Sequence, residues 1–190
     1  LYLPPTARVH RIPEAMPGEV AVLVCAMLAN GVRWLRTVGG VTMGDTVVVV
    51  GPGPQGLAAT VAASESGAGQ IIVVGLAGDE ARLAMAKRLG ANYTVAADSE
   101  DPRSLVAELT NGRLANVVID VTNSAASPAL AIDLVGTRGT LVLAGGAGAE
   151  PSSFSKNRVV SEEIRILGAN THDSPAVRQA LGIAESGRYP

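Results

Sequence analysis

Three glycines at fixed spacing are the clearest indication of chemistry in this chain. Four valines at 47–50 are followed by Gly51, Gly53 and Gly56 in the pattern Gly-x-Gly-x-x-Gly, and an alanine-rich stretch covers 57–66. In a strand, turn and helix of this kind, the first glycine permits a tight turn, the second lets the backbone approach a pyrophosphate, and the third lets the helix lie close to the sheet. The helix N-terminus then faces the phosphates with its unpaired N–H groups and partial positive charge. The pattern predicts a bound dinucleotide.

Strand and helix signals alternate regularly on the C-terminal side of this turn. Apolar runs bounded by turn residues predict further strands, and Asp101-Pro102, Ser127-Pro128 and Ser174-Pro175 each place a capping residue before a proline, which marks a helix start. We therefore predict an α/β fold with a doubly wound six-stranded parallel sheet in the order 3-2-1-4-5-6, because each parallel crossover needs the length of a helix. The expected strands are 47–50, 70–74, 93–95, 117–121, 140–144 and 164–167, and the expected helices are 57–66, 79–89, 102–110, 128–135 and 174–187.

The N-terminal region differs from this alternation. Four prolines precede Gly18, and a helical pattern over 19–38 is interrupted at Asn30-Gly31, which predicts two helices or one kinked helix. We expect 1–43 to be a lead-in from a largely missing catalytic domain, 44–173 to be the dinucleotide-binding domain, and 174–190 to be a terminal helix. The first residue is Leu1, and we expect the chain to be a piece of a longer one.

Composition excludes several classes of function. The chain is 47% hydrophobic and 17% charged with a net charge of −2, which fits a compact globular domain. It shows no cluster of Lys and Arg and few aromatic residues, so we expect no nucleic-acid partner. No apolar run approaches the roughly 18 residues of a membrane span, and we expect no membrane partner. The single cysteine, Cys25, suits a reducing compartment, which predicts a cytoplasmic location.

Motifs on both sides of the glycine turn are more restrictive than the turn itself. Gly-Asp-x-Val-x-Val leads into it at 44–49, and Ala-x-x-Leu-Gly-Ala ends the second helix at 86–91. With Cys25-Ala26, Arg82-Leu83 and Val118-Ile119-Asp120 in order, nearly the whole chain resembles the zinc-dependent alcohol and polyol dehydrogenases of the medium-chain dehydrogenase/reductase family. The resemblance implies that hydride transfer to or from nicotinamide interconverts a small-molecule substrate, a secondary alcohol or polyol, and its carbonyl compound. In the full-length protein Zn²⁺ would polarise the substrate oxygen. It also implies a homodimer, which the apolar sixth strand at the sheet edge favours independently.

The same resemblance assigns roles to single residues. Gly51, Gly53, Gln55 and Gly56 would cradle the pyrophosphate of NAD or NADP. Arg82 would contact the adenosine ribose, and Val121 and Thr122 would line the ribose crevice. Leu143, Ala169 and Thr171 would hold the nicotinamide carboxamide through backbone groups. Cys25 matches a zinc ligand, and the remaining zinc ligands and the catalytic residues would lie outside this chain. Without the resemblance, Cys25 is interpreted as a small buried core residue.

Gly75 departs from the pattern of NAD-specific relatives, which end the second strand with a carboxylate that accepts a hydrogen bond from the adenosine 2′-hydroxyl. The loop after it is longer than the commonest form, so Asp79 either reaches back to the ribose or caps the following helix. Arg82 is also placed to pair with a 2′-phosphate. The choice between NAD and NADP therefore stays open at the level of sequence.

Two alternatives to a zinc-dependent alcohol dehydrogenase stay open as well. A zinc-free quinone or enoyl reductase of the same family would need no thiolate at Cys25. A dinucleotide-binding module without catalytic activity would need only the glycine turn. His10 and His172, the two histidines, are expected to be solvated loop residues.

Overall fold

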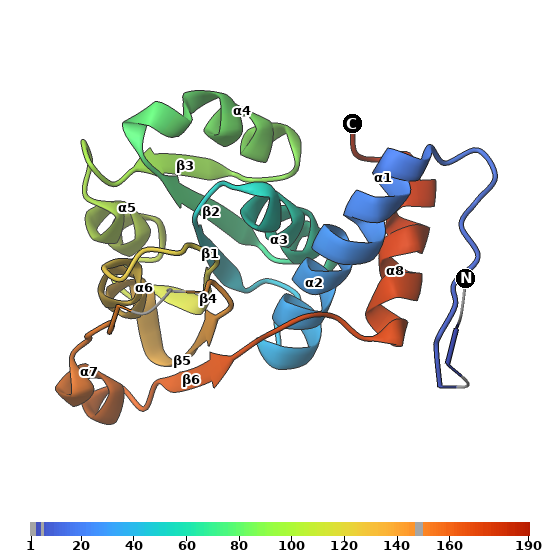
Figure 1. Cartoon of the computed structure of the whole chain (residues 1–190). Helices are drawn as coiled ribbons and strands as arrows, with labels where there is room; N and C mark the ends of the chain where they lie inside the picture. Colours follow the sequence, from blue (N-terminus) through green and yellow to red (C-terminus); the bar gives the residue numbers. More distant parts are fainter. Residues whose placement is uncertain (1–2, 5, 147–149) are drawn as a thin grey trace.

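The protein folds as a three-layer α/β/α sandwich in a computed structural model that describes residues 3–4, 6–146 and 150–190 (Figure 1). Six strands form one parallel sheet in the order β3-β2-β1-β4-β5-β6, which confirms the predicted fold class and strand order. The order reverses between β1 and β4, and the ligand crevice of such a sheet lies there, beyond the carboxyl ends of the strands. The strands are β1 (Thr46–Val50), β2 (Gln70–Gly75), β3 (Tyr93–Ala96), β4 (Ala115–Asp120), β5 (Val135–Leu143) and β6 (Arg165–Gly168).

Side chains alternate between two cores, one on each face of the sheet. Val47 and Val49 join the core shared with α3 (Pro54–Glu65), α4 (Glu80–Arg88) and α8 (Ser174–Glu185). Val48 and Val50 join the other core, which contains side chains from α5 (Pro102–Leu109) and α6 (Ser127–Leu134). These four valines are 0–4% exposed. Burial on both faces explains why the strands are continuous apolar runs rather than alternating ones.

The lead-in is one continuous helical segment rather than two helices. It comprises α1 (Gly18–Leu23), a π-helical stretch Val24–Leu28, α2 (Ala29–Val32) and a second π-helical stretch Arg33–Val38. The expected interruption at Asn30-Gly31 does not occur. Gly31 instead allows close packing of two helices. A Cβ on Gly31 would lie 2.8 Å from the carbonyl oxygen of Ala58 in α3. The absent side chain therefore lets the two helices approach each other.

This segment also corrects the expectation that no apolar stretch is long enough for a membrane span. Gly18–Val38 has 21 residues and a mean hydropathy of 1.4 over its most apolar part, so length and composition alone would allow it to cross a membrane. One side of it belongs to the domain core, where Ala29, Val32 and Leu35 are at most 1% exposed. In Figure 1 it lies beside α3 and α8. A buried core helix passes the same test of length and composition.

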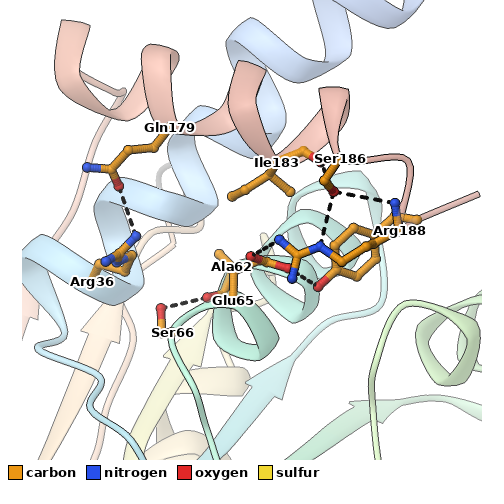
Figure 2. A network of polar contacts seen from close by, with 9 residues as sticks. Arg36, Ala62, Glu65, Ser66, Gln179, Ile183, Ser186 and Arg188 are labelled. Carbon is orange, nitrogen blue, oxygen red and sulfur yellow. Dashed lines mark hydrogen bonds and ion pairs between the residues drawn. The ribbon is translucent and has the colours of Figure 1, made fainter.

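Polar contacts attach the end of the chain to α3. Figure 2 shows Arg188 beside Glu65, with 2.7 Å between Nη2 and Oε2, and the hydroxyl of Tyr189 donates to Glu65 Oε1 at 2.6 Å. Burial, followed by the hydrogen bond to Glu65, raises the pKa of Tyr189. On the same side, Arg36 donates to Gln179 of α8.

Several local expectations were wrong in detail. Ser127 does not cap α6 but donates its hydroxyl proton to Asp120, and α6 ends at Leu134 with β5 following directly. The side chain of Asp79 does not cap α4 itself but accepts from Leu76 N–H in a capping box at the 3-10 turn Ala77–Asp79, just before α4. An additional helix, α7 (Lys156–Ser161), lies where no helix was expected, and Ser155 accepts a hydrogen bond from the backbone N–H of Arg158 at its start. In contrast, Asp101 caps α5 as expected by accepting from Arg103 N–H.

Candidate functional site

The glycine turn between β1 and α3 has the geometry that its sequence predicts. Gly51 has a φ of +102°, in the region that favours glycine. A Cβ on Gly56 would lie 1.8 Å from the carbonyl oxygen of Gly51, so no larger residue fits there. The helix N-terminus is consequently held against the end of the strand. Its first turn lies at the switch between β1 and β4, where its partial positive charge attracts an anion.

Two observations indicate that the turn fits a ligand. A Cβ on Gly53 would meet no protein atom within 4 Å, although the backbone there is extended and would accept other residues. The side-chain oxygen of Gln55 is buried and has no hydrogen-bond partner within the described residues. Buried polar atoms are rarely left unpaired in native proteins. Open space at the second glycine fits a pyrophosphate. The unpaired Gln55 oxygen is an acceptor and fits a donor such as a hydroxyl group of the same ligand.

The turn forms part of a crevice of about 990 Å³ at the carboxyl ends of the strands. Of the residues that the sequence assigned to a coenzyme, Gly51, Gly53, Gln55, Gly75, Arg82, Val121, Thr122 and Thr171 line this crevice. Gly56 is buried beneath the turn. Leu143 and Ala169 lie just behind the lining at the ends of β5 and β6, joined by a hydrogen bond of 2.8 Å from Ala169 N–H to the Leu143 carbonyl oxygen. Neighbouring residues 144–146 and 170–172 form the wall in front of them.

A buried carboxylate shapes the central wall. Asp120, at the end of β4 and 3% exposed, accepts hydrogen bonds from Thr122 N–H at 2.9 Å and from the Ser127 hydroxyl at 2.6 Å. The Thr122 hydroxyl donates to Ser127 Oγ at 2.6 Å, which closes the network. Such a fully hydrogen-bonded network rigidifies its segment.

The far end of the crevice is held by the lead-in helix. Thr171 has a φ of +51°, and its carbonyl oxygen accepts a hydrogen bond from Trp34 Nε1 at 2.9 Å. Arg33 Nη1 donates to the carbonyl oxygen of Asn170 at 3.0 Å, and His172 Nδ1 lies 2.9 Å from Asn30 Oδ1. Asn30, Trp34 and His172 all line the crevice, which sequence reasoning did not foresee. The packing expected of Trp34 is confirmed, since it is 4% exposed.

The opposite end of the crevice lies beyond the carboxyl end of β2. A Cβ on Gly75 would be 2.9 Å from Pro52 Cγ and 3.0 Å from Leu83 Cδ2, so these two side chains occupy the space where a side chain at 75 would begin. Asp79 accepts a hydrogen bond from Leu76 N–H at 3.2 Å and pairs with Arg82 Nη1 at 2.8 Å. The side chain of Asp79 is 18% exposed and that of Arg82 is 61% exposed. Both residues line the crevice.

Cys25 lies outside the crevice lining, half-buried in the lead-in helix and packed against the core. Burial raises the pKa of its thiol, so the protonated form is favoured and a metal would have to displace the proton. Within the described residues, no three His, Cys, Asp or Glu side chains come together. Zinc sites need three or four protein ligands. The described part of this chain does not fit Zn²⁺ by itself.

A larger hollow of about 1240 Å³ lies at the opposite, amino-terminal edge of the sheet. Its lining includes Asp45, Glu162 and five arginines, but none of the glycines of the turn. Ligands of doubly wound sheets bind at the carboxyl ends of the strands, where the helix N-terminus and the loops converge. The crevice at the glycine turn is therefore the candidate site.

Comparison with known proteins gives the same interpretation. The model of the family described as "Zinc-binding dehydrogenase" matches residues 54–186. The chain belongs to the zinc-binding dehydrogenase family. A relative, "Probable alcohol dehydrogenase adh" of Mycobacterium tuberculosis, is 44% identical over 193 residues, which cover 100% of this chain and 52% of the relative. A "Sorbitol dehydrogenase" of Halalkalibacterium halodurans is 32% identical over 92% of this chain and 50% of its own.

A solved structure of the zinc-binding dehydrogenase type supports the fold. The benzyl alcohol dehydrogenase of Acinetobacter calcoaceticus superposes with a TM-score of 0.86 at 26% sequence identity, over 95% of this chain and 50% of that chain. The chain thus spans about half the length of the relatives it matches. The matched half contains the six-stranded parallel sheet and the crevice at the carboxyl ends of its strands.

Proposed function

We propose that the whole protein is an NAD(P)-dependent oxidoreductase that interconverts a small alcohol and its carbonyl compound. The observation that carries this proposal is the crevice at the glycine turn, with open space over Gly53 inside it. Membership of the zinc-binding dehydrogenase family supports the reaction class, since relatives include an alcohol and a sorbitol dehydrogenase. The coenzyme, when bound, supplies or accepts a hydride at its nicotinamide ring.

The residues of this chain would bind and orient that coenzyme. N–H groups at the start of α3 and the turn at Gly53 would hold the pyrophosphate. The Asp120 network would keep Val121 and Thr122 in place at the centre of the crevice. Residues 169–171, supported by Arg33 and Trp34, would present backbone groups to the carboxamide. Fixing both ends of the coenzyme sets which face of the nicotinamide meets the substrate, and such orientation accounts for much of the rate of an enzyme reaction.

Replacement of Gly53 by Val tests the proposed binding mode. The extended backbone at Gly53 accepts the new side chain, and its Cβ meets no protein atom, so the fold should survive. The side chain would then occupy the space of the pyrophosphate and lower the affinity for NAD(P) at least about 100-fold, or about 2.8 kcal/mol. Titration calorimetry on the whole protein measures this change. Gly182→Val, on the exposed side of α8 where a Cβ also meets no atom, is the matched control.

Metal content separates this function from its nearest alternative. We propose that Cys25 supplies one zinc ligand in the whole protein. A zinc-free quinone or enoyl reductase is the second candidate, because the described part of this chain brings no three potential zinc ligands together. If Cys25 binds zinc, Cys25→Ser should lower the bound zinc in elemental analysis while the affinity for NAD(P) stays unchanged. Equal metal content in both proteins would favour the zinc-free reductase. Coenzyme binding without turnover of any alcohol or carbonyl compound would favour a non-catalytic module.

A further inference from the structure

The region beyond β2 bears on which coenzyme the proposed oxidoreductase uses. A carboxylate at position 75 would require Pro52 and Leu83 to shift, because Pro52 Cγ and Leu83 Cδ2 lie within 3.0 Å of where its Cβ would be. The loop that follows supplies a carboxylate from a different position. Asp79 Oδ2 is 3.2 Å from Leu76 N, which is bonded to the carbonyl carbon of Gly75. That oxygen therefore lies no more than about 6 Å from the Cα of Gly75.

The side chain of Asp79 takes part in a capping box at the 3-10 turn Ala77–Asp79 and does not cap α4 itself. It turns back toward the end of β2, where Leu76 N–H and Arg82 Nη1 hold its two oxygens in place. Each carboxylate oxygen can accept more than one hydrogen bond, so both partners leave acceptor capacity for a hydroxyl. Asp79 is part of the crevice lining.

The local charge disfavours a 2′-phosphate. Arg82 is the lone Lys or Arg among the described residues that line the crevice, and it is already paired with Asp79 at 2.8 Å. A phosphate with nearly two negative charges would therefore meet a neutral ion pair rather than a free cation. A ribose hydroxyl, in contrast, finds an oriented charged acceptor.

We propose that Asp79 is the residue that selects NAD over NADP, by accepting a hydrogen bond from the adenosine 2′-hydroxyl and repelling a 2′-phosphate. This inference rests on the proposed function, since it requires a nicotinamide dinucleotide in the crevice. Asp79 thereby replaces the carboxylate that Gly75 lacks. Arg82 pairs with the Asp79 carboxylate, which Leu76 N–H holds in place independently.

Calorimetric titrations of the whole protein with NAD⁺, NADP⁺ and the 2′-deoxyadenosine analogue of NAD⁺ test this assignment. We expect the wild type to bind NAD⁺ more tightly than both other ligands. Asp79→Asn should weaken NAD⁺ binding about tenfold, because a hydrogen bond to a charged acceptor is lost, and should strengthen NADP⁺ binding. The difference between NAD⁺ and its deoxy analogue should largely disappear in that variant.

Asp98→Asn is the matched control, because Asp98 also holds this loop but does not line the crevice. It should leave the ratio of the NAD⁺ and NADP⁺ affinities within about twofold of the wild type, well below the effect expected for a lost charged hydrogen bond. Arg82→Ala keeps the carboxylate and should retain the preference for NAD⁺, which gives a second test if Asp79→Asn folds poorly. A wild type that prefers NADP⁺, a ratio unchanged by Asp79→Asn, an equal shift with Asp98→Asn, or loss of the preference in Arg82→Ala would each overturn the assignment. If neither dinucleotide binds the wild type, the proposed function itself fails.

Discussion

Thr171 takes a backbone conformation that β-branched residues rarely adopt, with a φ of +51°. Such strain persists only where the surroundings hold it, and it is concentrated at functional sites. The surroundings here are two side chains of the lead-in helix, Trp34 and Arg33, whose nitrogens donate to the carbonyl oxygens of Thr171 and Asn170. At the scale of single residues, the lead-in helix is therefore part of the proposed coenzyme site and not only a connection to it.

Trp34→Phe tests this coupling. The variant retains an aromatic ring but loses the 2.9 Å hydrogen bond to Thr171. We expect the free energy of unfolding to fall by about 1–3 kcal/mol and the affinity for the coenzyme to fall several-fold, because the proposed carboxamide contact at Thr171 loosens. Urea denaturation and calorimetry measure the two effects. Val32→Ala, at a buried position on the same helix, should lower stability without changing affinity. Equal losses of affinity in both variants would argue against a specific role of Trp34.

At the scale of elements, two segments far apart in the sequence pack against α3. The lead-in helix approaches it closely at Gly31, and the residues after α8 bind its last turn through Glu65. The contact of Tyr189 with Glu65 depends on pH, because burial and then the hydrogen bond to Glu65 raise the pKa of Tyr189 above its ordinary value of 10.0. The folded protein therefore binds the phenolic proton more tightly than the unfolded chain.

The stabilisation by Tyr189 should consequently disappear at high pH. It is fully present below the pKa of an unfolded tyrosine, near 10, and is lost as the pH rises through the raised pKa of the folded state. We expect Tyr189→Phe to lower the free energy of unfolding by about 1 kcal/mol at pH 8, and the difference from wild type to shrink above pH 10. Urea denaturation across this pH range measures it. Tyr93→Phe, at an exposed position on β3, is the control. A difference that stays constant to pH 11 would contradict the linkage.

At the scale of the whole molecule, β6 ends the sheet and its residues are half-buried or exposed. An unprotected strand edge can pair with a second copy about a two-fold axis. We expect a homodimer whose sheet continues through β6, and light scattering at micromolar concentration should give twice the monomer mass. Leu167→Lys would bring like charges together near the axis and should yield monomers, whereas Thr94→Lys on the opposite edge strand, β3, should not. A wild-type monomer would refute the dimer.

The amino-acid sequence by itself determined the sheet, its strand order and the glycine turn. These follow from local signals, since apolar runs, Gly at positions needing close approach and Pro at helix starts depend on neighbours along the chain. Side-chain capping was less predictable. The cap at Asp101 formed as expected, whereas Ser127 found a partner outside its helix. A side chain that can form more than one hydrogen bond pairs with the group that lies nearest to it in the folded protein. The tertiary structure decides which group that is.

The tertiary structure alone decided which distant residues meet in the crevice. Asn30 and Trp34 reach residues 171 and 172 across nearly the whole chain, and no pattern in the sequence relates them. The structural roles of two glycines also became clear only from the tertiary packing. Gly31 looked like a helix break but permits contact with α3, and the missing carboxylate at Gly75 is explained by the side chains of Pro52 and Leu83, which fill its space. The physical reason is common to all of these cases: the packing of elements far apart in sequence sets the room available at each position.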